Sequence, residues 1–136
     1  EEMRAYAESE GISDKLRFLG FVERIGPLFR IAQFFVSTSL IEGFGIAHGE
    51  ALACGLPVLS TKTAGPDEMI REGVNGYFIE SDMPEAVEAG MERMIAADLS
   101  TMRAPARETA ERYSIARAVD SYEKLFESVV RPRIKL

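Results

Sequence analysis

Cysteine and tryptophan are nearly absent from this chain. Among its 136 residues there is one cysteine, Cys54, and no tryptophan. A single cysteine excludes an internal disulfide and a cysteine-rich zinc site. Cys54 stands among apolar residues before Gly55, which predicts a small core side chain.

Positive charge is also scarce. The formal net charge is −6, and a nucleic-acid surface needs clustered lysine and arginine to neutralise phosphates. We therefore expect no nucleic acid as a partner. The one basic cluster, formed by Arg131, Arg133 and Lys135, is interpreted as a solvated end, with a membrane or partner contact as the alternative.

Long apolar runs are absent as well. None approaches the roughly 18 residues that span a bilayer, and the amino terminus reads Glu-Glu-Met-Arg, which is acidic and polar and unlike a signal peptide. We predict a cytoplasmic protein, with peripheral attachment to a membrane left open for the full-length protein.

What is present is the composition of a globular domain, 46% hydrophobic and 28% charged. Helical patterns alternate with short apolar runs that are typical of buried strands. The runs extend from Leu16 to Leu19, from Gln33 to Ser37, from Pro57 to Ser60 and from Gly76 to Ile79. This alternation predicts an α/β fold, a Rossmann-like parallel sheet with flanking helices.

Helices are predicted over 2–10 and 46–54, and capping patterns mark further helix starts at Gly65–Glu68 and Asp82–Glu85. Two apolar stripes at helical spacing follow, and we interpret both as core packing. The first contains Val87, Met91, Met94 and Ile95, and the second contains Ile115, Val119, Tyr122, Phe126 and Val129.

The length corresponds to one domain, residues 1–136, without an interdomain linker. A self-contained doubly wound domain has about five or six strands, whereas four are predicted here. The chain also opens in a helical pattern with no strand before it. We therefore expect a single partial domain that lacks its first strands.

Glu42 and Glu50 stand eight positions apart around the turn Gly43-Phe44-Gly45. A predicted strand precedes the turn and a predicted helix follows it. In a parallel sheet such a turn lies at the carboxyl ends of the strands, where ligands bind, and a helix start offers unpaired N–H groups to an anion such as a diphosphate. Glycines at 43 and 45 let the backbone approach that anion closely.

Five segments in order resemble the carboxy-terminal domain of retaining glycosyltransferases of group 1, which are two-domain enzymes of the GT-B fold. They are Leu-Arg-Phe-Leu-Gly-Phe-Val at 16–22, Ser-Leu-Ile-Glu-Gly-Phe-Gly at 39–45, Glu-Ala-Leu-Ala-Cys-Gly-Leu-Pro-Val-Leu-Ser-Thr at 50–61, Gly-Pro-Asp-Glu-Met-Ile at 65–70 and Gly-Val-Asn-Gly-Tyr-Phe-Ile at 73–79. The resemblance implies that this domain binds a nucleotide-diphosphate sugar and that the enzyme transfers the sugar with retention of configuration.

The resemblance also implies roles for individual residues. Glu50 matches a glutamate that bonds the donor ribose, and Glu42 matches one that faces the donor sugar and diphosphate, so Glu42 is the candidate catalytic residue. The remaining candidates for donor binding are Gly43, Phe44 and Gly45 in the turn, the small hydroxyl residue Ser39, and Phe21 and Val22 beside the nucleotide base. His48 departs from the family's usual apolar residue, and we interpret it as structural or on the surface, with a donor contact as the alternative.

Parts of the family's pattern are missing. The acceptor-binding amino-terminal domain is absent, and so is the Arg and Lys pair that neutralises the diphosphate leaving group. We therefore expect this chain alone to be inactive. Because its sheet is incomplete, we expect either that it is part of a longer chain or that it self-associates to cover the gap. No Asp-x-Asp pair is present, and the resemblance implies no metal and no cofactor beyond the nucleotide-sugar substrate.

Other interpretations remain open from the residues alone. Paired glutamates also serve glycoside hydrolases as acid and nucleophile, and a GT-B epimerase or phosphorylase would share the fold without this glutamate spacing. A non-catalytic nucleotide-binding or regulatory α/β module is the alternative that involves no enzyme. The base of the nucleotide remains open among uridine, guanosine and adenosine.

Overall fold

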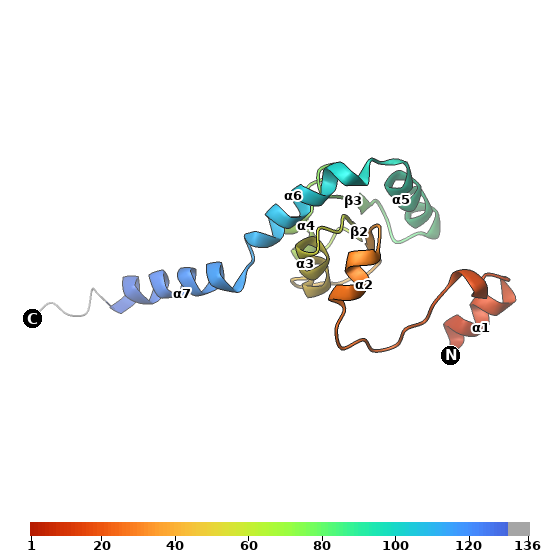
Figure 1. Ribbon diagram of the computed structural model, residues 1–136, viewed down its shortest axis with the longest axis horizontal. Coiled ribbons are helices and arrows are strands. Elements are labelled where there is room, and N and C mark those ends of the chain that lie inside the picture. The colour runs from red at the N-terminus through yellow and green to blue at the C-terminus, as the bar shows by residue number, and fades with distance from the viewer. Residues whose placement is uncertain (131–136) are drawn as a thin grey trace, which may run out of the picture.

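The computed structural model describes residues 1–130. The predicted basic cluster at Arg131, Arg133 and Lys135 lies outside the described residues. At the centre of the structure is a parallel sheet of order β1-β2-β3 (Figure 1), formed by β1 (Phe35–Ser37), β2 (Val58–Thr61) and β3 (Gly76–Ile79). The predicted parallel α/β sheet is thereby confirmed.

The central strand β2 is buried along its whole length, as expected for a parallel sheet that is covered on both faces. Its successive side chains alternate between the two faces. Val58 packs in one cluster with Leu52, Leu56 and Met69, whereas Leu59 packs in another with Ile79 and Met94. The chain approaches itself closely at Gly76, where a Cβ atom would lie 2.0 Å from the Val58 carbonyl oxygen.

Helices flank the sheet and connect its strands. Along the chain they are α1 (Glu2–Ser9), the short 3-10 helix η1 (Ser13–Lys15), α2 (Gly26–Ile31), α3 (Ile46–Ala53), α4 (Ala64–Met69), α5 (Pro84–Ala96), α6 (Leu99–Glu111) and α7 (Ile115–Val130). Helices α3 and α6 contribute to the cluster around Val58, and α5 contributes to the cluster around Leu59. Cys54 packs against the first cluster as a partly buried residue, as predicted.

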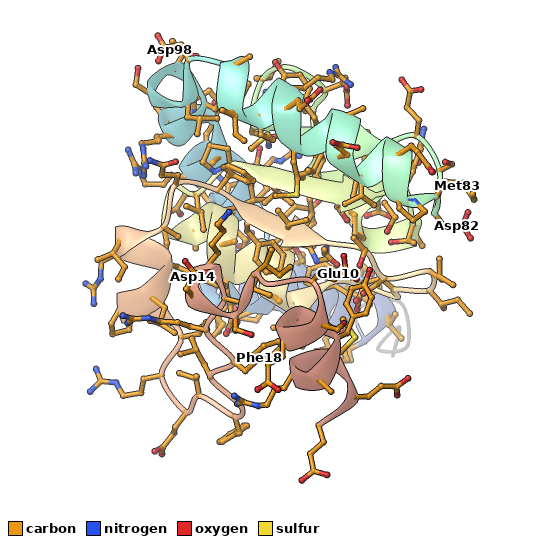
Figure 2. The ribbon with its side chains drawn as sticks, turned by 90° about the vertical axis from the view of Figure 1, so that its right-hand side faces the viewer. Glu10, Asp14, Phe18, Asp82, Met83 and Asp98 are labelled. Atoms are coloured by element: carbon orange, nitrogen blue, oxygen red, sulfur yellow. The ribbon has the colours of Figure 1, made fainter. Side chains whose placement is uncertain are left out.

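The strand predicted at Leu16–Leu19 is wrong. This segment is extended but belongs to no strand, and it runs outside the sheet between α1 and α2 (Figure 1). Figure 2 shows Phe18 beside α1, and the Arg4 guanidinium lies over its ring while donating a hydrogen bond to its carbonyl oxygen at 3.1 Å. An extended segment becomes a strand only when a neighbouring strand pairs with its backbone, and no described strand lies beside this one.

The two apolar stripes are only partly core. In α5, Met94 is buried and Val87 packs against the core, but Met91 and Ile95 are exposed. In α7 no residue is buried, so the predicted core packing of Ile115, Val119, Tyr122, Phe126 and Val129 is wrong within the described residues. The reason is geometric, because α7 projects away from the sheet and its flanking helices (Figure 1).

The predicted start of α5 is correct in position but not in its cap. Met83 occupies the N-cap position, and no side chain caps the helix. The next helix, α6, does have a side-chain cap. Its N-cap residue is Asp98, whose carboxylate accepts a hydrogen bond from the Ser100 backbone N–H. Figure 2 shows Asp82 and Asp98 far apart and both pointing outward.

Candidate functional site

The turn between β1 and α3 has the expected strand-turn-helix geometry. Gly45 is the N-cap residue of α3 and has a φ of +79°, a left-handed conformation that strongly favours glycine. The His48 N–H in the first turn of α3 donates to the Gly45 carbonyl oxygen at 3.0 Å, whereas the N–H groups of Ile46 and Ala47 donate to no backbone acceptor among the described residues. This end of α3 therefore presents two unpaired backbone donors beside Gly43-Phe44-Gly45.

The start of α4 holds the turn from one side. A Cβ atom on Gly65 would lie 2.0 Å from the Phe44 carbonyl oxygen, so the two backbones touch and only glycine fits at 65. The Phe44 ring contacts the Tyr113 ring edge-on, with the centroids 5.5 Å apart. Both contacts fix Phe44 between α4 and the end of α6.

Ser39 lies at the carboxyl ends of the two neighbouring strands β1 and β2. Its backbone carbonyl accepts a hydrogen bond from the Thr61 hydroxyl, and its own hydroxyl accepts one from Ser37 at 3.3 Å. The structure thus places Ser39 at the edge of the sheet where the turn also begins.

The extended segment at 20–22 and helix α3 border one hollow of about 440 Å³. Phe21 and Val22 line it from the segment, and Glu50 lines it from α3. The Phe21 side chain is 94% exposed, so its ring is accessible from solvent. The structure therefore brings together three predicted donor-binding residues that lie almost thirty positions apart in the sequence.

Glu50 also borders a second hollow beside α3, of about 530 Å³. Its lining is mainly apolar and includes Phe44, Arg107 and Tyr113. Arg107 and Tyr113 were not predicted from the sequence, because α6 carries no strong apolar stripe that would have indicated its packing.

Glu42 lines neither of these hollows. It is half-buried, and its Cγ atom lies 3.4 Å from the position that a Cβ atom on Gly45 would take. Neither Glu42 nor Glu50 has an ion-pair or side-chain hydrogen-bond partner among residues 1–130. Both carboxylates are therefore available to a ligand.

His48, in the first turn of α3, is only 2% exposed. Its Nε2 atom lies 2.9 Å from the Ser60 hydroxyl of β2, and its ring contacts Phe35 of β1 edge-on. Burial lowers the pKa of His48 from its ordinary value of 6.5, while Glu42 and the Gly45 backbone act in the opposite direction. The structural interpretation of His48 fits this burial better than direct contact with a donor.

Within the described part of the chain, no group of three His, Cys, Asp or Glu side chains is arranged to hold a metal ion. None of the described helices combines the length and the apolar character that crossing a membrane requires.

Comparison with known proteins assigns the chain to a family. The family described as "Glycosyl transferases group 1" matches residues 1–113. The chain belongs to this glycosyltransferase family. It is 35% identical over 122 residues to the D-inositol 3-phosphate glycosyltransferase of Geodermatophilus obscurus, and the match covers 88% of this chain and 27% of the relative. It is 29% identical to the N-acetyl-alpha-D-glucosaminyl L-malate synthase of Bacillus anthracis, over 88% of this chain and 32% of that protein.

Solved glycosyltransferase structures share the fold. A glycosyltransferase from Rickettsia africae superposes with a TM-score of 0.86 at 20% identity, over 95% of this chain and 36% of that one. HepE of Anabaena, solved in complex with UDP, superposes with a TM-score of 0.80 at 24% identity, over 93% of this chain and 36% of that one. The group 1 chain described here thus spans about a quarter to a third of the length of these relatives.

Proposed function

We propose that this group 1 domain binds a nucleotide-diphosphate sugar for retaining transfer of the sugar to an acceptor held by another part of the full-length protein. The observation that carries the proposal is the hollow shared by Phe21, Val22 and Glu50. An exposed aromatic ring and backbone groups suit a nucleotide base, and a free carboxylate suits the ribose diol. HepE, which has the same fold, was solved in complex with UDP.

In this proposal Glu50 accepts hydrogen bonds from both ribose hydroxyls. Hydrogen bonds to an ionised acceptor are roughly twice as strong as neutral ones. Glu50 is exposed and free of partners among the described residues, so ligand binding breaks no existing ion pair. The roles of Glu50, Phe21 and Val22 stay predictions until they are tested.

The diphosphate would follow at the start of α3. The unpaired N–H groups there and the positive end of the helix dipole favour an anion, and Gly43 and Gly45 leave room for it beside Phe44. Ser39 would lie at the same edge with its hydroxyl toward the donor. The diphosphate is the leaving group, and its further neutralisation by basic side chains is assigned to the part of the protein outside this chain.

Glu42 is proposed to face the sugar. As the bond between the anomeric carbon and the diphosphate oxygen breaks, positive charge develops at the sugar, and a nearby carboxylate stabilises it. The electron pair of the breaking bond leaves with the diphosphate. The acceptor hydroxyl oxygen forms the new bond on the same face of the ring, and its proton passes to the departing diphosphate oxygen. No metal ion and no further cofactor takes part in this scheme.

The test is a screen of the full-length protein against UDP, GDP and ADP and their sugars, by thermal shift and saturation-transfer NMR. We expect one nucleoside diphosphate to raise the melting temperature, its sugar to be transferred with excess EDTA present, and the product to keep the donor's anomeric configuration. Inverted product would contradict the retaining mechanism. Binding without transfer to any acceptor would favour a regulatory nucleotide-binding module, and cleavage of an aryl glycoside would favour a hydrolase.

A further inference from the structure

The buried side chain of His48 connects strand β2 to the turn that carries Glu42. Its Nε2 atom lies 2.9 Å from the Ser60 Oγ atom on β2. Its ring contacts Phe35 of β1 with the two centroids 5.3 Å apart and the planes at 84°. Contacts with two strands, β1 and β2, therefore fix the orientation of the imidazole.

Hydrogen-bond directions identify one protonated nitrogen of this ring. The Ser60 hydroxyl has one proton, which it donates to the Thr61 carbonyl oxygen at 3.0 Å. Ser60 must then accept a hydrogen bond from His48 Nε2, so Nε2 carries a proton. Nδ1 is buried and has no hydrogen-bond partner among residues 1–130.

The Nδ1 atom lies directly under the turn. A Cβ atom on Gly45 would lie 2.7 Å from His48 Nδ1 and 3.4 Å from Glu42 Cγ. The imidazole and the side-chain stem of Glu42 therefore both lie close to the Gly45 backbone. A shift of the ring toward the turn would press on this backbone, because packed interiors leave little free space.

We propose that His48 is a positioning residue for Glu42, an inference that rests on the proposed function. The ring is held in place by its hydrogen bond to Ser60 and lies close to the Gly45 turn. Its position therefore sets where the Glu42 carboxylate meets the donor sugar. No ion pair joins the ring to Glu42 among the described residues, so the carboxylate stays available to the ligand. His48 itself is buried and touches no substrate in this arrangement.

The test compares three substitutions of His48 in the full-length protein. His48→Gln places an amide nitrogen where Nε2 lies and keeps the hydrogen bond to Ser60. His48→Leu has a similar volume but no polar atom, and His48→Asn is too short to reach Ser60. Thr109→Val serves as the control, because Thr109 is equally buried but its hydroxyl accepts a hydrogen bond from Asn75 and has no bond to Ser60 or the turn.

We expect His48→Leu and His48→Asn to lower kcat about 10- to 100-fold, the range for a misplaced catalytic group, with donor KM changed by about twofold or less. His48→Gln should retain most of kcat, and Thr109→Val should lower the melting temperature without this loss. A normal kcat in His48→Leu would overturn the inference, because packing alone would then suffice. A His48→Gln variant as poor as His48→Leu would overturn it too.

A measurement without turnover separates this inference from the proposed function. The amide NMR shifts of Gly43, Phe44 and Gly45 should move in His48→Leu and return toward wild type in His48→Gln. If the wild-type protein transfers no sugar, the proposed function fails, and these shifts still decide whether His48 positions the turn. Turn amides that are unchanged in His48→Leu would contradict the inference in either case.

Discussion

Glu42 and Glu50 differ in their surroundings although they flank the same turn. Glu50 is exposed and borders both hollows beside α3, whereas Glu42 is half-buried beside Gly45 and His48. An exposed carboxylate at a hollow suits ligand binding. A half-buried carboxylate at the sheet edge suits action on the reacting sugar. The geometry thus supports two different proposed roles.

Replacing Glu42 should affect the chemical step. Glu42→Gln keeps the size of the side chain and removes its charge, so we expect turnover to fall more than donor affinity, the pattern of an interaction made mainly in the transition state. Steady-state kinetics and donor titration of the full-length protein measure the two effects. Equal losses in both would make Glu42 a plain binding residue.

His48 should make the fold sensitive to acid. Burial lowers its pKa in the folded state from 6.5, so the unfolded chain binds more protons below about pH 6.5. The contribution of His48 to the free energy of unfolding is therefore fully present above that pH. It is lost as the pH drops from 6.5 toward the lowered folded pKa.

The measurement is the urea midpoint of the full-length protein at pH 7.5 and pH 5.5, compared with the same shift in His48→Gln. The two proteins share all their carboxyl groups, so any difference between the shifts belongs to the imidazole. The wild-type midpoint should fall more than that of His48→Gln. Equal shifts would show that His48 titrates as it does in the unfolded chain.

The sequence indicated the glutamates and the turn but not the environment of His48. The turn residues are adjacent, so their pattern is visible in one segment. The partner of His48 is Ser60, which lies twelve positions away on the next strand, and a single histidine between apolar residues gives no indication of such a bond. Burial of this kind follows from tertiary packing alone.

At the level of elements, the unit β1-turn-α3 was predicted well because its causes are local. Gly45 and Gly55 have φ values of +79° and +73° and bound α3 at its two ends. Helix α6 was missed because its buried residues, Met102, Ala106 and Thr109, are few and partly polar. The strand predicted at 16–19 failed because a strand needs a paired neighbour, which the local sequence does not report.

The close contact between α4 and the turn should make Gly65 sensitive to substitution. In Gly65→Ala the new methyl group would collide with the Phe44 carbonyl oxygen, at 2.0 Å in the present geometry. Both atoms belong to the backbone region and have little freedom to move, so the turn should shift. We expect weaker donor binding and lower turnover in the full-length protein.

Gly49→Ala is the matched control, because a Cβ atom at 49 meets no atom within 4 Å and alanine favours the helix. Calorimetric donor titration of both variants measures the effect. Donor affinity that is normal in Gly65→Ala would show that the turn tolerates displacement, and the proposed diphosphate contact would lose its support.

The whole molecule consists of a packed centre with two projecting parts. The segment containing α1 and η1 and the helix α7 both lie away from the sheet (Figure 1). The family match nevertheless extends over residues 1–113 and includes the first of these parts. The exposed apolar side chains of Leu16, Phe18 and Leu19 are therefore proposed to meet other strands in the full-length protein.

The 136-residue chain by itself should not transfer sugar. In the proposed mechanism the acceptor and the basic groups for the diphosphate come from outside it, so we expect weak nucleotide binding, no turnover and self-association through exposed apolar surface. Light scattering and a transfer assay with a panel of nucleotide sugars check this. A monodisperse monomer that transfers sugar would contradict the expectation.

The proposed nucleotide site lies between the 20–22 segment and Glu50, and calorimetric titration is its sharpest test. The full-length protein is titrated with the nucleoside diphosphate selected by the screen and compared with Glu50→Ala and Glu111→Ala, since Glu111 borders only the second hollow. We predict that Glu50→Ala weakens binding by about 1.5–3 kcal/mol, the range for hydrogen bonds to charged groups, while Glu111→Ala binds like wild type. Unchanged affinity in a folded Glu50→Ala protein, or a loss confined to Glu111→Ala, would contradict the account.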